Sequence, residues 1–102
     1  MANLIAMYGI PADAAAFDHY YFATHVPLAK KVPGLRHYGV TTGPVTTLEG
    51  PVGYHLIATL TFDSLADIRA ALVSPEGQAT AADLANFATG GVSLFIAETT
   101  SV

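Results

Sequence analysis

Alternation of apolar and polar residues marks four segments of the chain as β-strands. The clearest is YHLIATLTF, residues 54–62, in which Leu56 and every second residue after it are apolar. The same alternation would place His55 on the opposite face, together with Ile57. Residues 3–8, 35–42 and 92–98 form the other predicted strands, and in the second of these Tyr38 and His37 would face opposite sides.

The segments between these strands carry helix signals. Asp13 before a run of alanines is typical of an N-cap and predicts a helix over residues 14–31. Pro27 removes a backbone hydrogen bond within this helix, so we expect a kink or break near residues 24–25. Serines before residues 65–73 and 75–87 predict two more helices. Residues 43–53, rich in Gly and Pro, are expected to form a loop.

The order β-α-β-β-α-α-β predicts one α+β domain over residues 1–102. It matches the ferredoxin-like split-βαβ plan, a four-stranded antiparallel sheet with helices on one face. The first and last strands are apolar on both faces, although helices cover only one. The chain is also 52% hydrophobic and only 12% charged, against a typical charged share of about 25%. We therefore expect the free sheet face to pack against a second copy in a homodimer.

Charge and residue counts argue against several classes of function. The net charge is −4 with only 4 Lys and Arg, so no basic surface is expected for nucleic acid or an anionic membrane. The absence of Cys removes disulfides and thiolate chemistry. The His residues lack metal-ligand spacing and there is no Gly-rich phosphate loop, so neither metal nor cofactor is predicted. Without a signal peptide or a membrane-spanning stretch, the sequence predicts a cytoplasmic protein.

One segment carries candidate chemistry. Phe17, Tyr21 and His25 are spaced by four residues and would share one helix face, which Leu28 continues. An irregular turn before Pro27 would leave the His25 imidazole room to point into a cavity and exchange protons near neutral pH. The competing interpretation is structural: His25 caps a kinked helix by bonding a backbone carbonyl, and the two aromatic residues belong to the core.

At this segment the sequence resembles the EthD family of dimeric α+β-barrel proteins. The pattern F-x3-Y-x3-H-x-P-L-x4-P-G-L over residues 17–35 is similar to the N-terminal signature of that family. S-P-E-G at 74–77 and D-L-x-N-F at 83–87 add to the resemblance, which extends over almost the whole chain. It implies a ferredoxin-like subunit, a homodimer through the sheets, and a pocket between each sheet and its helices.

The resemblance also implies roles for particular residues. Relatives in the same superfamily that isomerise methylmuconolactone use a His and a Tyr in the pocket, which implies catalytic roles for His25 and Tyr38. A second His of these enzymes would correspond to His55. They also place a Cys in the pocket, whereas this chain has none. Tyr21, Phe17 and Leu28, together with His55, would then bind the substrate.

Three hypotheses follow for function. The first is a small dimeric enzyme that moves a proton on a compact, apolar or aromatic, oxygen-bearing metabolite without a cofactor, as an isomerase, lyase or cyclase does. His25 would be the acid and base, and Tyr38 or Tyr21 would orient an oxygen of the substrate. The second is a non-catalytic ligand carrier or accessory protein of a catabolic oxygenase. The third is a cofactor-free monooxygenase.

Overall fold

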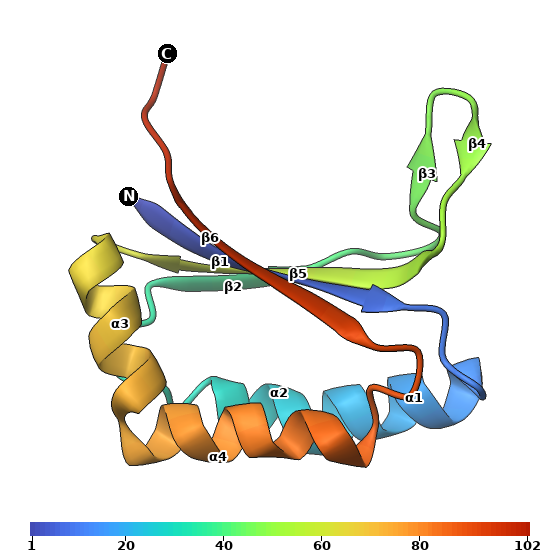
Figure 1. Cartoon of the computed structure of the whole chain (residues 1–102), viewed down its shortest axis with the longest axis horizontal. Helices are drawn as coiled ribbons and strands as arrows, with labels where there is room; N and C mark the ends of the chain where they lie inside the picture. Colours follow the sequence, from blue (N-terminus) through green and yellow to red (C-terminus); the bar gives the residue numbers. More distant parts are fainter.

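A four-stranded antiparallel sheet forms one layer of the molecule. The computed structural model describes residues 1–102, and its main sheet has the strand order β2-β5-β1-β6. These strands are β1 (Ala2–Gly9), β2 (His37–Val40), β5 (Tyr54–Phe62) and β6 (Val92–Glu98). All helices lie against one face of this sheet (Figure 1). The predicted ferredoxin-like α+β fold is therefore confirmed.

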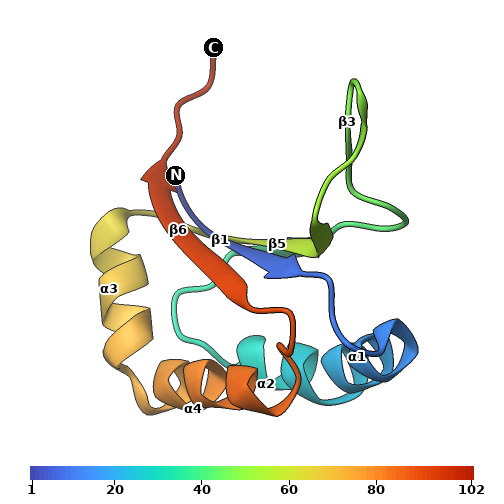
Figure 2. The same cartoon turned by 45° about the vertical axis from the view of Figure 1, so that its right-hand side comes forward.

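The helical layer begins where side chains cap the free backbone N–H groups. Asp13 accepts a hydrogen bond from the Ala16 N–H at 3.0 Å, and Ser64 and Ser74 begin the later helices in the same way. The helices are α1 (Ala14–Tyr20), α2 (Val26–Ala29), α3 (Leu65–Val73) and α4 (Pro75–Asp83), and a 3-10 turn (Leu84–Asn86) follows α4. Figure 2 shows α4 beside α2 beneath the sheet, with α1 continuing beyond α2.

The kink or break expected near residues 24–25 takes the form of an irregular turn within a continuous helix. Between α1 and α2 the chain forms a single π-helical turn (Tyr21–His25), in which the N–H of Val26 reaches back to the carbonyl of Tyr21. Val26 keeps right-handed helical dihedrals although a proline follows it. The extra residue in this turn accommodates the irregularity that Pro27 imposes, and the helix ends at Ala29 rather than at Lys31.

Residues 43–53, which the sequence predicts to be a loop, contain a small β-hairpin. The strands β3 (Thr46–Thr47) and β4 (Gly50–Pro51) pair with each other, and Gly50 has a φ of 129°, a conformation that favours glycine. The Thr47 hydroxyl donates to the Gly50 carbonyl at 3.0 Å. The hairpin rises on the side of the sheet opposite the helices (Figure 2).

The predicted orientation of His55 is wrong. Tyr8 pairs with Leu56, but the next residue, Gly9, pairs with Tyr54, so His55 is an extra residue in a β-bulge. The bulge turns the imidazole towards α1, where it contacts the Phe17 ring at a centroid distance of 4.9 Å. His55 therefore does not share the open sheet face with Ile57.

The core between the two layers is dominated by aromatic rings. Phe17 and Tyr21 from the first helix, Tyr8 from β1, and Phe87 after α4 pack with centroid distances of 5.3–5.7 Å. Ile68 of α3 is fully buried beside them. Because the rings come from both layers, the core fixes the helices on the sheet.

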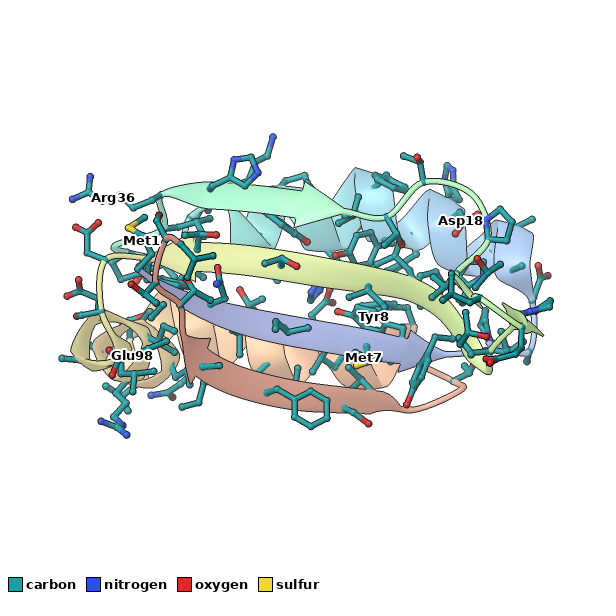
Figure 3. All side chains as sticks on the ribbon, turned by 90° about the horizontal axis from the view of Figure 1, so that it is seen from above. Met1, Met7, Tyr8, Asp18, Arg36 and Glu98 are labelled. Atoms are coloured by element: carbon teal, nitrogen blue, oxygen red, sulfur yellow. The ribbon has the colours of Figure 1, made fainter.

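The other face of the sheet has no helix over it (Figure 3). On this face Ile5 pairs with Phe95 across β1 and β6, and Met7 pairs with Ile57 across β1 and β5. Phe95 is 52% exposed, whereas the other three are half-buried. The sheet therefore presents an unpartnered apolar surface, as its sequence predicts.

Candidate functional site

A cavity of about 80 Å³ lies between the sheet and the helices. Its walls are mostly apolar and come from all four main strands, the first helix, α3 and α4. Four side chains with titratable groups line it: His25, Tyr8, Tyr21 and Tyr38. The cavity therefore surrounds a small polar group with apolar side chains, an arrangement typical of small-molecule sites.

His25 is held in this cavity by a buried acid. The residue is only 3% exposed, and Nδ1 lies 3.0 Å from Oδ2 of Asp83. The Phe87 ring packs against the imidazole at a centroid distance of 4.7 Å. These contacts fix the ring from two sides, so His25 has one defined orientation at the cavity wall.

Asp83 accepts hydrogen bonds from several elements at once. In addition to His25, the Tyr20 hydroxyl donates to Oδ1 at 2.6 Å and the Asn86 amide donates to Oδ1 at 2.9 Å. Burial alone would raise the pKa of this carboxyl, but the hydrogen bonds from Tyr20, Asn86 and His25 outweigh burial and lower it. Asp83 is therefore ionised at neutral pH and acts only as an acceptor.

The ionised acid determines the state of the imidazole. Burial lowers the pKa of His25 below its ordinary value, although the hydrogen bond and charge of Asp83 act in the opposite direction. At neutral pH the ring is therefore neutral, and Nδ1 carries the proton because Asp83 can only accept it. Nε2 makes no hydrogen bond within the chain, so its lone pair is free to accept a proton.

Two tyrosines place a second polar group in the same cavity. The hydroxyls of Tyr21 and Tyr38 lie 2.5 Å apart, one donating to the other. Burial is the main cause that raises the pKa of both hydroxyls, so both stay protonated near neutral pH. This bond uses only one of the two protons, so the other can be donated either to the neighbouring Tyr8 hydroxyl or to a ligand oxygen.

The structure brings together some of the predicted site residues and separates others. His25, Tyr38 and Tyr21 line one cavity, whereas Phe17 is buried in the aromatic core beside it. Leu28 is half-buried and does not line the cavity. His55 lies outside it and pairs with Asp18, 2.7 Å from Nε2 to Oδ1.

Asp83 is the residue of this candidate site that sequence reasoning missed. A signal for it exists, because α4 ends at Asp83 and an acid at a helix C-terminus interacts unfavourably with the helix dipole. Such a position indicates that another interaction holds the residue there. Asn86, three residues later, bonds the same carboxylate and belongs to the same signal.

The side chains form no metal site, because no three His, Cys, Asp or Glu residues lie close enough together to hold a metal ion. The helices are also too short or too polar for any of them to cross a membrane. The polar groups at the cavity are suited instead to accepting and donating protons.

Two solved structures share the fold of this chain at low sequence identity. A dimeric protein of unknown function with a ferredoxin-like fold from Bacteroides fragilis is 16% identical, with a TM-score of 0.65 and coverage of 96% of this chain and 95% of its own. SnoaB, a cofactor-independent oxygenase from Streptomyces nogalater, is 18% identical, with a TM-score of 0.62 and coverage of 97% and 94%. At these identities the likeness concerns the fold alone.

Closer relatives match over nearly their full length. An EthD family protein from Bacillus halodurans has a TM-score of 0.89 and 37% identity, covering 98% of this chain and 99% of its own. An uncharacterised 11.0 kDa protein from the thcB–thcC intergenic region of Rhodococcus erythropolis is 40% identical over 103 residues, which is 100% of this chain and 98% of that protein. The family model of the EthD domain matches residues 11–91. This chain therefore belongs to the EthD family.

Proposed function

We propose that the cavity binds a compact, oxygen-bearing organic molecule and that His25 moves a proton on it without a cofactor. The observation that carries this proposal is the hydrogen bond between His25 Nδ1 and Asp83, which leaves Nε2 as a free base at an apolar cavity. The hydroxyl pair of Tyr21 and Tyr38 lines the same cavity and supplies a proton donor for an oxygen of the ligand.

The proton transfer divides between these groups. Nε2 of His25 takes a proton from a carbon next to a carbonyl, and the electrons of that C–H bond form a C=C bond while the carbonyl oxygen gains negative charge. The free hydroxyl proton of the tyrosine pair stabilises this oxygen. Where the substrate carries a C=C bond beyond that carbon, the enolate extends to the far carbon of this bond. The imidazolium, held by the Asp83 carboxylate, returns the proton there, and the C=C bond moves into conjugation with the re-formed carbonyl, so the net result is an isomerisation.

The size of the cavity adds a requirement for entry. Its 80 Å³ is smaller than the roughly 300–1,000 Å³ of typical ligand pockets, so the walls must move to admit a ring-sized molecule. Leu72 of α3 and Leu94 of β6 line the cavity and are 41% and 51% exposed. We infer that the ligand enters between these two side chains, because they are the large apolar lining residues that are exposed to solvent.

Deuterium exchange tests the proposed chemistry without a known substrate. A panel of compact cyclic ketones and unsaturated lactones is incubated with the protein in D₂O, and loss of the α-proton signals is followed by NMR. We expect faster exchange for at least one compound, and a loss of about 100-fold or more in His25→Gln. His19→Gln is the matched control, because His19 lies on the same helix and is exposed.

Each outcome separates the candidate functions. A compound that binds the wild-type cavity but exchanges no faster than in buffer would favour the ligand carrier over the enzyme. Oxygen consumption with a phenolic compound would instead favour the monooxygenase. Exchange that persists in His25→Gln would contradict the role of His25, provided that the variant has the circular dichroism and NMR spectra of a folded protein.

We also propose that the open face of the sheet is the contact surface of a homodimer. The apolar side chains of Ile5, Met7, Ile57 and Phe95 lie together there with nothing packed over them. A two-fold axis over this face would bury them in both copies at once. Multi-angle light scattering is expected to give twice the 10.6 kDa mass of the chain.

Charge substitutions distinguish this surface from other exposed apolar positions. Ile5→Lys should shift the protein to the monomer, because the lysine would stand in the middle of the contact. Val73→Lys is the control, since Val73 is 71% exposed on α3, on the helical side of the molecule. A wild-type monomer at micromolar concentration, or an equal effect of both substitutions, would contradict the proposed surface.

A further inference from the structure

A second cleft, larger than the first cavity, opens at the end of the sheet where α1 meets the hairpin segment. Its volume is about 500 Å³, within the roughly 300–1,000 Å³ of small-molecule sites. Residues from α1, from the bulged start of β5 and from the segment 41–52 line it. Asp18 lies at this end of the molecule, opposite the end that carries Arg36 and Glu98 (Figure 3).

The cleft has a negative electrostatic character. Asp18 is the only acidic residue that lines it, and no Lys or Arg does so. Oδ1 of Asp18 bonds Nε2 of His55 at 2.7 Å, whereas Oδ2 has no partner in the chain and the side chain is 51% exposed. The bond to His55 limits the rotation of the carboxylate and leaves its second oxygen free for a ligand.

Aromatic and aliphatic side chains stand around this carboxylate. Phe22 is 52% exposed and lines the cleft together with Tyr54 and Ile10. Phe22 lies four residues after Asp18, so both side chains project from the same face of the first helix. A carboxylate beside accessible aromatic rings attracts cations that also have an apolar body, since the face of the ring adds a cation–π interaction.

The cleft is separate from the cavity at His25. No residue lines both, and Phe17, only 3% exposed, stands between them, with its ring against His55 on one side and Tyr21 on the other. A ligand in the cleft therefore contacts neither His25 nor the tyrosine pair.

We infer that this cleft is a second binding site, and that it takes a small organic ammonium with an aromatic or aliphatic body. The ammonium donates to the free oxygen of Asp18, and the body lies against Phe22 and Tyr54. Anions should bind poorly, because the site offers them the Asp18 carboxylate and no Lys or Arg.

Three probes with one body and different charges test this inference. Phenethylamine, which is protonated at neutral pH, phenethyl alcohol and phenylacetate are titrated into ¹⁵N-labelled protein, and the amide signals of residues 18, 22, 54 and 55 are followed. We expect phenethylamine to bind with a Kd in the millimolar range or below, the alcohol at least about tenfold more weakly, and phenylacetate not at all.

Variants assign the binding to the proposed groups. Asp18→Asn should weaken phenethylamine binding at least about tenfold, because it removes the charge-assisted hydrogen bond. Asp13→Asn is the matched control: it removes the same charge from the same helix and keeps an N-cap residue. Phe22→Leu, which keeps an apolar contact without the ring, should weaken binding about threefold.

Several results would overturn the inference. Similar affinities for the three probes would mean that the cleft selects apolar bodies and not ammonium groups. An equal effect of Asp18→Asn and Asp13→Asn would mean that net charge and not this carboxylate attracts the probe. Absence of binding by phenethylamine would remove the site altogether, and it would leave the proposed chemistry at His25 unaffected because the two sites share no residue.

Discussion

Replacing Asp83 by Asn should reverse the tautomer of His25 while leaving the fold intact. In the native protein the carboxylate only accepts, so Nδ1 carries the imidazole proton and Nε2 is the base. Oδ1 already accepts from both Tyr20 and Asn86, so the Asn side chain fits best with its oxygen at that position. Its NH₂ group then faces Nδ1 and donates to it, which moves the imidazole proton to Nε2.

The cost to stability can be estimated from the same contacts. Asp83→Asn keeps all three hydrogen bonds but loses their charge assistance, and it should cost about 1 kcal/mol. Asp83→Ala instead leaves buried His25 without a partner, while Tyr20 and Asn86 can turn to water, and it should cost about 2–4 kcal/mol.

Imidazole ¹⁵N NMR and urea denaturation measure the two effects separately. The NMR spectrum reports which ring nitrogen carries the proton, and we expect it to change from Nδ1 to Nε2 in Asp83→Asn. Asp18→Asn is the control, because it alters an exposed Asp–His pair and should change stability by no more than about 1 kcal/mol. If Asp83→Asn keeps the proton on Nδ1, the argument that an ionised Asp83 determines the base is refuted.

Two further predictions concern acid sensitivity and helix packing. Because burial lowers the pKa of His25, the unfolded state binds more protons, so stability should fall as pH drops below about 6.5. Urea denaturation at several pH values should show this loss in the wild type, and His25→Gln should remove it. The second prediction concerns Gly77, where a Cβ would lie 1.9 Å from the Ala71 carbonyl oxygen. Gly77→Ala should therefore force α3 and α4 apart and cost about 1–3 kcal/mol. Gly53→Ala, where nothing lies within 4 Å, should leave the melting temperature nearly unchanged, and equal effects of the two would contradict this account.

The sheet could be predicted from the sequence because each long strand carries its own pattern of burial. In the segment 54–62 buried and less buried residues alternate because one face of the strand packs on the helices. The observed strand β5 begins and ends at the residues that this alternation predicts. The strands β3 and β4 have two residues each and bury little, so no periodicity marks them. The bulge at His55 lies opposite Gly9 of β1, whose backbone approaches Gly90 so closely that a Cβ on Gly9 would lie 2.2 Å from the Gly90 carbonyl oxygen. No pattern within residues 54–62 reports this contact.

The candidate site could be predicted only in part, for a similar reason. Tyr21 and Tyr38 could be identified because regular helix and strand periods place them on the inner faces. His25 could be identified by its spacing of four from Tyr21 and by its place beside Pro27, although its exact orientation depends on the π turn. Asp83 comes from a different helix, 58 residues further along the chain, and its role depends on how α4 packs against the first helix. A single sequence does not show which residues of two separate helices come into contact. The only local sign of the interaction is the unfavourable position of an acid at a helix C-terminus.

The π turn accounts for the placement of His25 and for the failure at Leu28. At 3.6 residues per turn, residues spaced by four advance around a helix by about 40° at each step, so a regular helix would carry His25 away from the face that begins at Phe17. The wider turn over Tyr21–His25 offsets this drift, and Tyr21, His25 and Ala29 are all buried, four residues apart. The same shift leaves Leu28 only half-buried. The local irregularity beside Pro27 is therefore what keeps the base of the proposed site in the cavity, in agreement with the frequent occurrence of π turns at functional sites.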